Sequence, residues 1–262
     1  MNEQFICGIE PKLNIHLMES ILPAVIFLVV HWYASLFTQS FFNHRYAAHQ
    51  MFKMSRTVEK FFFILSWIFQ GSSYLSPHTY GVLHRLHHAF ADTPNDPHSP
   101  KFDKSLWRMM WKTKEIYVGI AKHTYQVDDK YLKNLPQWDW FDAFACSWFS
   151  RLVWGTLYVA LYVYFQVPFW LYPLLIIHFF MGPIHGAIIN WFAHKIGYRN
   201  YKIEDTSTNI VPVDMLMWGE ALHNNHHYKG SDPNFAHQKG EFDPMYPLIR
   251  LMVKMNIIAL AK

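Results

Sequence analysis

Long apolar runs alternate with polar, histidine-rich segments along this chain. A helix that crosses a bilayer needs about 20 mostly apolar residues. Three runs approach or exceed that length, namely Ile21–Phe42, Trp148–Phe165 and Phe169–Ile189. Only the short turn Gln-Val-Pro separates the last two, and its proline suits the turn of a helical hairpin. The pattern predicts an all-α integral membrane protein with about three transmembrane helices.

A fourth apolar run is too short to cross. Phe61–Leu75 has about 15 residues, which at 1.5 Å each reach roughly 22 Å of a hydrocarbon core about 30 Å thick. We interpret it as an interfacial or re-entrant helix. One polar segment follows the first span, another follows Phe61–Leu75 and a third follows the hairpin. All three then lie on the same side of the membrane. Basic residues after the first span mark that side as cytoplasmic, namely Arg45, Lys53, Arg56 and Lys60.

The polar stretch before the hairpin contains a predicted surface helix. Between Lys101 and Lys114, five basic residues alternate with tryptophan, leucine and methionine. Such a pattern is typical of an amphipathic helix that lies on a membrane surface.

Composition supports a membrane protein. Charged residues make up 16% and aromatic residues 18% of the chain, whereas soluble domains carry about 25% charged residues. The net charge of +4 suits an anionic membrane surface and is too small to favour a nucleic-acid partner. Cys7 and Cys146 have no CxxC spacing, so neither a disulfide framework nor a thiolate metal site is indicated. Because no linker divides the chain, residues 1–262 are predicted to form a single domain.

Eight of the 17 histidines fall in three tight clusters, which are His44 and His49, then His84, His87 and His88, and then His223, His226 and His227. In a helix, residues i, i+3 and i+4 share one face, so each HxxHH motif is expected to point all three rings together. The i, i+5 pair of the first cluster lies about 140° apart on an α-helix, which suits ligands of two different metal ions.

Metal binding explains these clusters better than packing does. An isolated histidine such as His31, His178 or His185 usually finds a local hydrogen-bond partner, and His98 is expected in a surface loop or cap. Eight imidazoles buried together without a metal would be costly to desolvate. They are too many for one ion, since structural zinc needs four ligands. The absence of an HExxH motif disfavours a zinc protease, and a pair of irons with open positions, able to bind O2, is one alternative.

Three motifs, NHRYAAH, HRLHH and GEALHNNHH, occur in this order with apolar segments between them. With them the chain resembles the membrane fatty-acid desaturase family, in the branch of stearoyl-CoA desaturases and bacterial Δ9 acyl-lipid or acyl-CoA desaturases. The resemblance extends to DTPNDPHSP and NWFAHKIGYRN. It implies that His194 is a ninth metal ligand and that Asn190 binds metal through water. Stearoyl-CoA desaturases have two spans before the first motif, whereas this chain has room for one.

The resemblance implies a di-iron enzyme with a histidine-rich cytoplasmic cap, in the bacterial inner membrane. The enzyme would use two Fe ions and O2 to insert a cis double bond at Δ9 into a saturated acyl chain carried on CoA or lipid. No fused cytochrome b5 domain is expected, so a separate ferredoxin or cytochrome b5 type donor with a reductase is expected. Asp96 and Glu220 are candidates to orient the imidazole N–H groups. Arg45 and Arg85 are candidates to hold a phosphate-bearing head group.

Two other functions fit part of the pattern. An alkyl or carotenoid hydroxylase would use the same histidine motifs on the same scaffold. A histidine-rich metal transporter would instead need ionisable ligands near the bilayer midplane. The three clusters lie at or beyond the ends of the predicted spans, which favours an enzyme.

Overall fold

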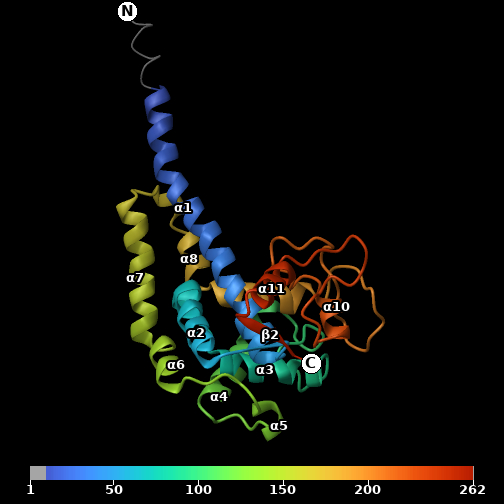
Figure 1. The fold of residues 1–262 in the computed structure, drawn as a ribbon. Coiled ribbons are helices and arrows are strands. Elements are labelled where there is room, and N and C mark those ends of the chain that lie inside the picture. The colour runs from blue at the N-terminus through green and yellow to red at the C-terminus, as the bar shows by residue number, and fades with distance from the viewer. Residues whose placement is uncertain (1–9, 262) are drawn as a thin grey trace, which may run out of the picture.

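The computed structural model describes residues 10–261, and most of them are helical (Figure 1). Helix α1 (Glu10–Thr38) continues without a break into a π-helix, η1 (Gln39–Ala48). Within this pair, Met18–Ala48 is long and apolar enough to cross a membrane. The first predicted span is therefore present as one continuous helix that leads into the first histidine motif.

The short apolar run forms α2 (Arg56–Gln70), which packs beside α1. The Ser55 hydroxyl caps α2 by accepting a hydrogen bond from the Val58 N–H. A 3-10 turn, η2 (Gly71–Ser73), ends it, and α3 (Pro77–Phe90) then packs against η1. The chain thus returns to the end of α1 from which it left, as a re-entrant segment must.

The predicted hairpin is only partly regular. Helix α7 (Trp148–Tyr164) is straight, but the second half is divided into η3 (Phe169–Leu171), α8 (Leu174–Phe179), α9 (Met181–Ala187) and a π-helical turn, η4 (Ile188–Phe192). The axis bends by 72° between α8 and α9. Of the described residues, one helix alone is long and apolar enough to span, or two with the bent pair counted as one span. The first predicted span is one continuous helix, whereas the second half of the predicted hairpin is broken and bent.

Pro183 accounts for the bend between α8 and α9. Proline has no N–H, so it cannot complete the helical hydrogen bond to the carbonyl of Phe179, four residues earlier. That carbonyl instead accepts a hydrogen bond from the Ser72 hydroxyl, at 3.3 Å. The break in the helix is therefore compensated by η2, which lies beside it.

The remaining elements surround the histidine-rich end of α1. They are α4 (Leu106–Ala121), α5 (Asp129–Leu132), α6 (Asp139–Ala145), α10 (His223–Tyr228), α11 (Met245–Lys254) and the strands β1 (Phe52–Met54) and β2 (Ile258–Leu260). The two strands pair antiparallel, a small departure from the predicted all-α fold. Helix α4 is amphipathic as predicted, with Met109 buried and Trp107 82% exposed. Helix α10 and its loops lie on the side of the molecule away from α7 (Figure 1).

Gly71, between α2 and η2, tests how tightly this region is packed. Its φ is +54°, and a Cβ there would lie 1.7 Å from the Tyr158 hydroxyl oxygen. We expect Gly71→Ala to destabilise the protein by on the order of 3 kcal/mol, because backbone strain and overpacking add.

The measurement is thermal unfolding in detergent. Gly240→Ala is the matched control, since Gly240 also has a positive φ, +93°, but has no atom within 4 Å of the added Cβ. Equal losses of stability in the two variants would show that the contact with Tyr158 contributes nothing.

Candidate metal centre

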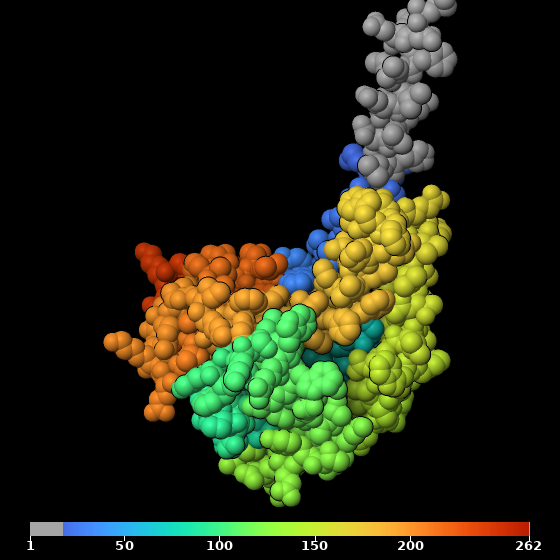
Figure 2. Space-filling view, turned by 180° about the vertical axis from the view of Figure 1, so that it is seen from behind, coloured from blue at the N-terminus to red at the C-terminus, as the bar shows by residue number. Residues whose placement is uncertain are grey.

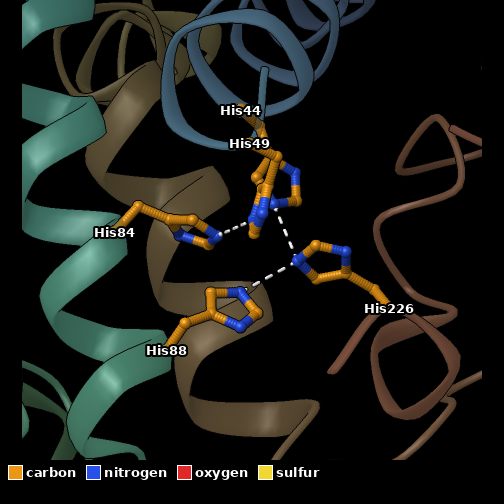
Figure 3. Close-up of side chains that lie close together, drawn as sticks. All are labelled: His44, His49, His84, His88 and His226. Carbon is orange, nitrogen blue, oxygen red and sulfur yellow. Dashed lines mark hydrogen bonds between the residues drawn. The ribbon is translucent and has the colours of Figure 1, made fainter. Parts of the chain in front are cut away.

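Nine histidines converge into two groups at the end of α1. The first group is His44, His49, His84, His88 and His226 (Figure 3). The second group is His87, His194, His223 and His227. Within each group, one nitrogen from every ring lies within 4.8 Å of the others. The structure thus brings together all nine histidines that the sequence singled out as ligands.

The spacing of the ring nitrogens fits metal coordination. Neighbouring Nε2 atoms are 2.8–3.3 Å apart in the two groups. Metal–nitrogen bonds of about 2.1 Å at right angles would separate adjacent ligand atoms by about 3.0 Å. Imidazole nitrogen suits iron as well as zinc and copper. Each group can therefore hold one metal ion, and the residues present fit an all-histidine pair.

Each HxxHH motif supplies both groups. On α3, His84 and His88 belong to the first group and His87 to the second. On α10 the division is reversed, because only His226 reaches the first group. The three rings of the second motif lie together as expected, with centroids 4.6–6.0 Å apart, but they divide between the two groups. The i, i+4 pair serves one group, and the i+3 ring crosses to the other.

The first motif also differs from its expectation. His44 and His49 lie in the same group, although α-helical geometry places them about 140° apart. The reason is η1, where the His49 N–H donates to the His44 carbonyl at 3.1 Å. In such i→i+5 geometry, residues five apart come to lie nearly above one another.

Carboxylates contact the outer nitrogens of three of these rings. A Glu220 oxygen lies 2.5 Å from His44 Nδ1, and an Asp96 oxygen lies 2.9 Å from His87 Nδ1. Both residues were candidates from the sequence. Such contacts fix the tautomer that leaves Nε2 free for a metal and raise the basicity of the ring.

Asp205 makes the third contact and was missed. Its carboxylate lies 3.0 Å from His227 Nδ1. Asp92 is also near the centre, with an oxygen 3.8 Å from His194 Nδ1. Asp205 lies in an irregular loop, where no periodicity marks it. The general tendency of metal-binding histidines to pair with carboxylates is the signal that could have prompted a search for it.

The two arginines are held by the protein itself. Arg45 is fully buried and donates to Glu220 Oε1 and Asp243 Oδ2, both at 2.8 Å. Arg85 donates to four main-chain carbonyls, those of Ala47, Ala48, Tyr131 and Lys133. These contacts use both guanidinium groups, so neither is available to a head group. Arg45 instead helps to position the Glu220 carboxylate against His44.

Burial sets the charge of the centre. It lowers the pKa of His84 and of His226, and the neighbouring His44 ring lowers both further. The two rings are therefore neutral near pH 7, with a lone pair available for a metal. Burial alone would raise the pKa of Glu220, but His44 and Arg45 hold it below its usual value. The carboxylate beside His44 thus stays ionised.

Several other histidines lie in the interior. His98 was expected in a surface loop or cap, but it is buried and its ring packs 4.3 Å from that of His87. The main-chain N–H of His98 donates a hydrogen bond to Asp96 Oδ1, which holds the loop inward. His31 and His178 hydrogen bond to each other at 2.8 Å, and His185 hydrogen bonds to Gln39. These partners are side chains from distant segments and not the local partners expected for isolated histidines.

A cavity of about 1930 Å³ opens onto the metal centre. It is much larger than ordinary ligand sites of about 300–1,000 Å³. From the centre it is lined by His44, His84, Glu220, Asn190 and His223. Its other walls come mainly from α4, α7 and α9, and most of them are apolar. Figure 2 shows the hollow between α4, in green, and α7, in yellow-green.

The size and mainly apolar lining of this cavity suit a hydrocarbon chain, and histidines of both groups line it. Asn190, on η4, lines the same cavity as His223. Its binding to metal through water stays a prediction.

Comparisons with known proteins agree with this geometry. The fatty acid desaturase family model matches residues 19–241. Delta-9 acyl-lipid desaturase 1 of Arabidopsis thaliana is 30% identical over 223 residues, covering 83% of this chain and 67% of that protein. The sn-1 stearoyl-lipid 9-desaturase of Synechocystis sp. is 28% identical, covering 84% of this chain and 64% of that protein. The Delta-9 desaturase-like 5 protein of Arabidopsis thaliana is 26% identical and covers 83% and 70%, respectively.

The family match extends over most of the chain and includes all nine clustered histidines. This chain belongs to the fatty acid desaturase family and is an oxidoreductase that acts on fatty acids.

Proposed function

We propose that this protein is an O2-dependent di-iron desaturase that inserts a cis double bond at Δ9 into a saturated acyl chain. The observation that carries the proposal is the pair of histidine groups, of five and four rings, beside one large and mainly apolar cavity. The names of relatives such as Delta-9 acyl-lipid desaturase 1 support the Δ9 position.

The reaction divides its tasks between cofactor and protein. Two bound irons would supply O2 activation and hydrogen abstraction from an unactivated C–H bond, which acid–base side chains cannot perform. The nine imidazoles would hold the irons, and Asn190 would contribute through a water molecule. Glu220, Asp96 and Asp205 keep the Nδ1 side of their histidines paired, so that Nε2 faces inward. The apolar cavity walls hold the chain extended and limit the access of water.

A membrane lipid is the proposed carrier of the acyl chain. The cavity walls include Trp107 and Trp111 on α4 and Trp148 on α7, and all three are largely exposed. Tryptophan favours the membrane–water interface. An acyl chain could therefore enter sideways from the bilayer between α4 and α7, without release of its lipid. Acyl-CoA is the alternative carrier.

Location and electron supply complete the proposal. The basic residues after α1 support a bacterial inner membrane with the metal centre on the cytoplasmic side. Each double bond takes two electrons from outside, which a ferredoxin or cytochrome b5 type protein with its reductase would deliver.

The first test is a fatty-acid profile. Wild type and His226→Ala are expressed with ferredoxin and its reductase in an aerated bacterial host that lacks desaturases. Gas chromatography–mass spectrometry should find a new Δ9 monounsaturated acid, first in the phospholipid fraction, with the wild type only. His226→Ala removes a ring that contacts both His44 and His88 in the first group, so its metal content should fall from about two ions per chain.

His123→Ala is the control, because His123 is exposed and belongs to neither group. It should keep the metal content of the wild type. Hydroxylated chains in place of unsaturated ones would replace the desaturase proposal with that of a hydroxylase. A new monounsaturated acid that appears first in the acyl-CoA fraction would reject the lipid carrier.

The carboxylate contact missed in the sequence gives a second test. Asp205→Asn removes the charge that faces His227 Nδ1. We expect the metal affinity of the second group to fall about 10- to 100-fold, as is usual for such partners. Chelator competition measures it. The neighbouring Glu204→Gln, which changes an exposed carboxylate, should leave affinity unchanged. Equal affinities in both variants would contradict a role for Asp205.

A further inference from the structure

The helix that carries the third histidine motif has two chemically different faces. Successive residues of a helix are rotated by about 100°, so His223, His226 and His227 of α10 fall within about 100° of its circumference. Asn224 and Asn225 fall on the opposite face. All three histidines belong to the metal groups. The two asparagines face the other way, so they need an explanation of their own.

Helix α10 depends on other segments for its orientation. It has 6 residues, and its N-cap, Leu222, makes no side-chain hydrogen bond to it. An isolated helix shorter than about 12–15 residues is only marginally stable in water. Asn209, in the segment before the helix, replaces the missing cap. Its Oδ1 accepts hydrogen bonds from the main-chain N–H groups of Asn224 and Asn225, at 2.9 and 3.2 Å. The first turn of α10 is therefore capped from outside the helix.

The side-chain amide of Asn225 is fully buried and has every hydrogen-bonding position filled. Its Oδ1 accepts from the Nδ2 groups of Asn200 and Asn209, at 2.8 and 2.9 Å. Its Nδ2 donates to the Phe235 carbonyl at 2.8 Å and to Glu241 Oε2 at 2.7 Å. A carbonyl and an ionised carboxylate can only accept hydrogen bonds, so the amide has one possible orientation.

Asn224 connects α10 to the segment that follows His194. Its Oδ1 accepts from the main-chain N–H groups of Asn200 and Tyr201, at 2.9 and 2.8 Å. Its Nδ2 donates to the Tyr201 carbonyl at 3.1 Å. In the second group, His194 Nε2 lies 3.1 Å from His223 Nε2. The bonds of Asn224 thus join two segments that both supply ligands to the second group.

The rotation of α10 about its axis matters because its rings serve both groups. His226 enters the first group from the side opposite α3 (Figure 3), while His223 and His227 belong to the second group. A rotation of the helix would displace ligands of both groups at once. Because the asparagine face is hydrogen bonded to neighbouring segments, it opposes this rotation whether or not a metal is bound.

We propose that Asn225 and Asn209 are positioning residues of the metal centre. They fix the rotation of α10 and thereby place its three histidines for both groups. Both residues act through the ligands, and neither binds the metal. This inference rests on metal binding, which is part of the proposed function.

The test makes the same isosteric change at two neighbouring positions. Asn225→Asp places a carboxylate oxygen against the Phe235 carbonyl and Glu241, and none of these groups can donate. Asn224→Asp instead keeps an oxygen where the N–H groups of Asn200 and Tyr201 donate. The charge and size of the two variants are equal, so a difference between them reports the hydrogen bonds.

The probe is Co²⁺, bound to the full chain in nanodiscs. Chelator competition measures the Kd, and the absorption spectrum reports the geometry of the nitrogen ligands. We expect Asn225→Asp to raise the Kd about tenfold or more and to change the spectrum, as is usual when a residue that orients ligands is lost. Asn224→Asp should keep the spectrum and a Kd within about threefold of wild type, because its charge-assisted bonds remain.

A milder variant and a control complete the set. Asn200→Ala changes a half-buried side chain at the edge of the network and leaves Asn225 Oδ1 with one donor, Asn209. It should fold where Asn225→Asp does not, and it should raise the Kd several-fold. Gln238→Ala is the control, because it removes an exposed amide whose residue bonds to Glu241 through the main chain alone. It should bind Co²⁺ as the wild type does.

Three results would overturn the inference. The first is an unchanged Kd in Asn225→Asp and Asn200→Ala. The second is a lower Tm with an unchanged Kd and spectrum, because Asn225 would then stabilise the fold without positioning ligands. The third is equal weakening in Asn224→Asp and Asn225→Asp, since charge alone would explain it. The expected pattern of Co²⁺ binding together with a wild type that makes no double bond supports the inference and rejects the desaturase function.

Discussion

Nine imidazole rings share one buried region, and the rest of the structure offsets the free-energy cost of burying them together. Without metal, each ring would lose its hydration and repel any charged neighbour. The structure meets this constraint by directing Nε2 atoms inward and pairing several Nδ1 atoms with carboxylates. Segments as distant as η1, α3, α10 and the turn after η4 must meet at one place, so the return of the chain after α2 and the bend between α8 and α9 follow from the same requirement.

Arg45 shows how far this constraint extends. Its buried guanidinium connects Glu220, ahead of α10, with Asp243, ahead of α11, while Glu220 contacts His44. A buried ion pair contributes little net stability, but removal of one partner costs about 3–5 kcal/mol. The network thus fixes the C-terminal segments relative to η1 and orients a ligand. An arginine that sequence reasoning assigned to substrate is better explained as part of the support of the metal centre.

Local sequence patterns predicted what local geometry controls. The apolar run of α1, the amphipathic character of α4 and eight of the nine clustered histidines follow from spacing along one element, whereas His194 followed from the family resemblance. The π-helix at His44 was not predictable in this way. Its pattern of apolar residues does not distinguish the 3.6 residues per turn of an α-helix from the wider turn of a π-helix. Nor was the 72° bend, which needs Ser72 from another segment to replace the bond that Pro183 cannot make. Asp205 and His98 reach the centre only through tertiary folding of loops.

The division of each HxxHH motif between the two groups has a mechanical consequence. Since α3 and α10 each supply rings to both groups, neither helix can shift without disturbing both sites. A metal in one group would hold the two helices in the orientation that the other group needs, so it removes part of the ordering cost of the second site. The two sites are therefore expected to fill as a coupled pair. Two independent sites, each built on its own helix, would lack this coupling and would not keep both metals in fixed positions beside one acyl chain.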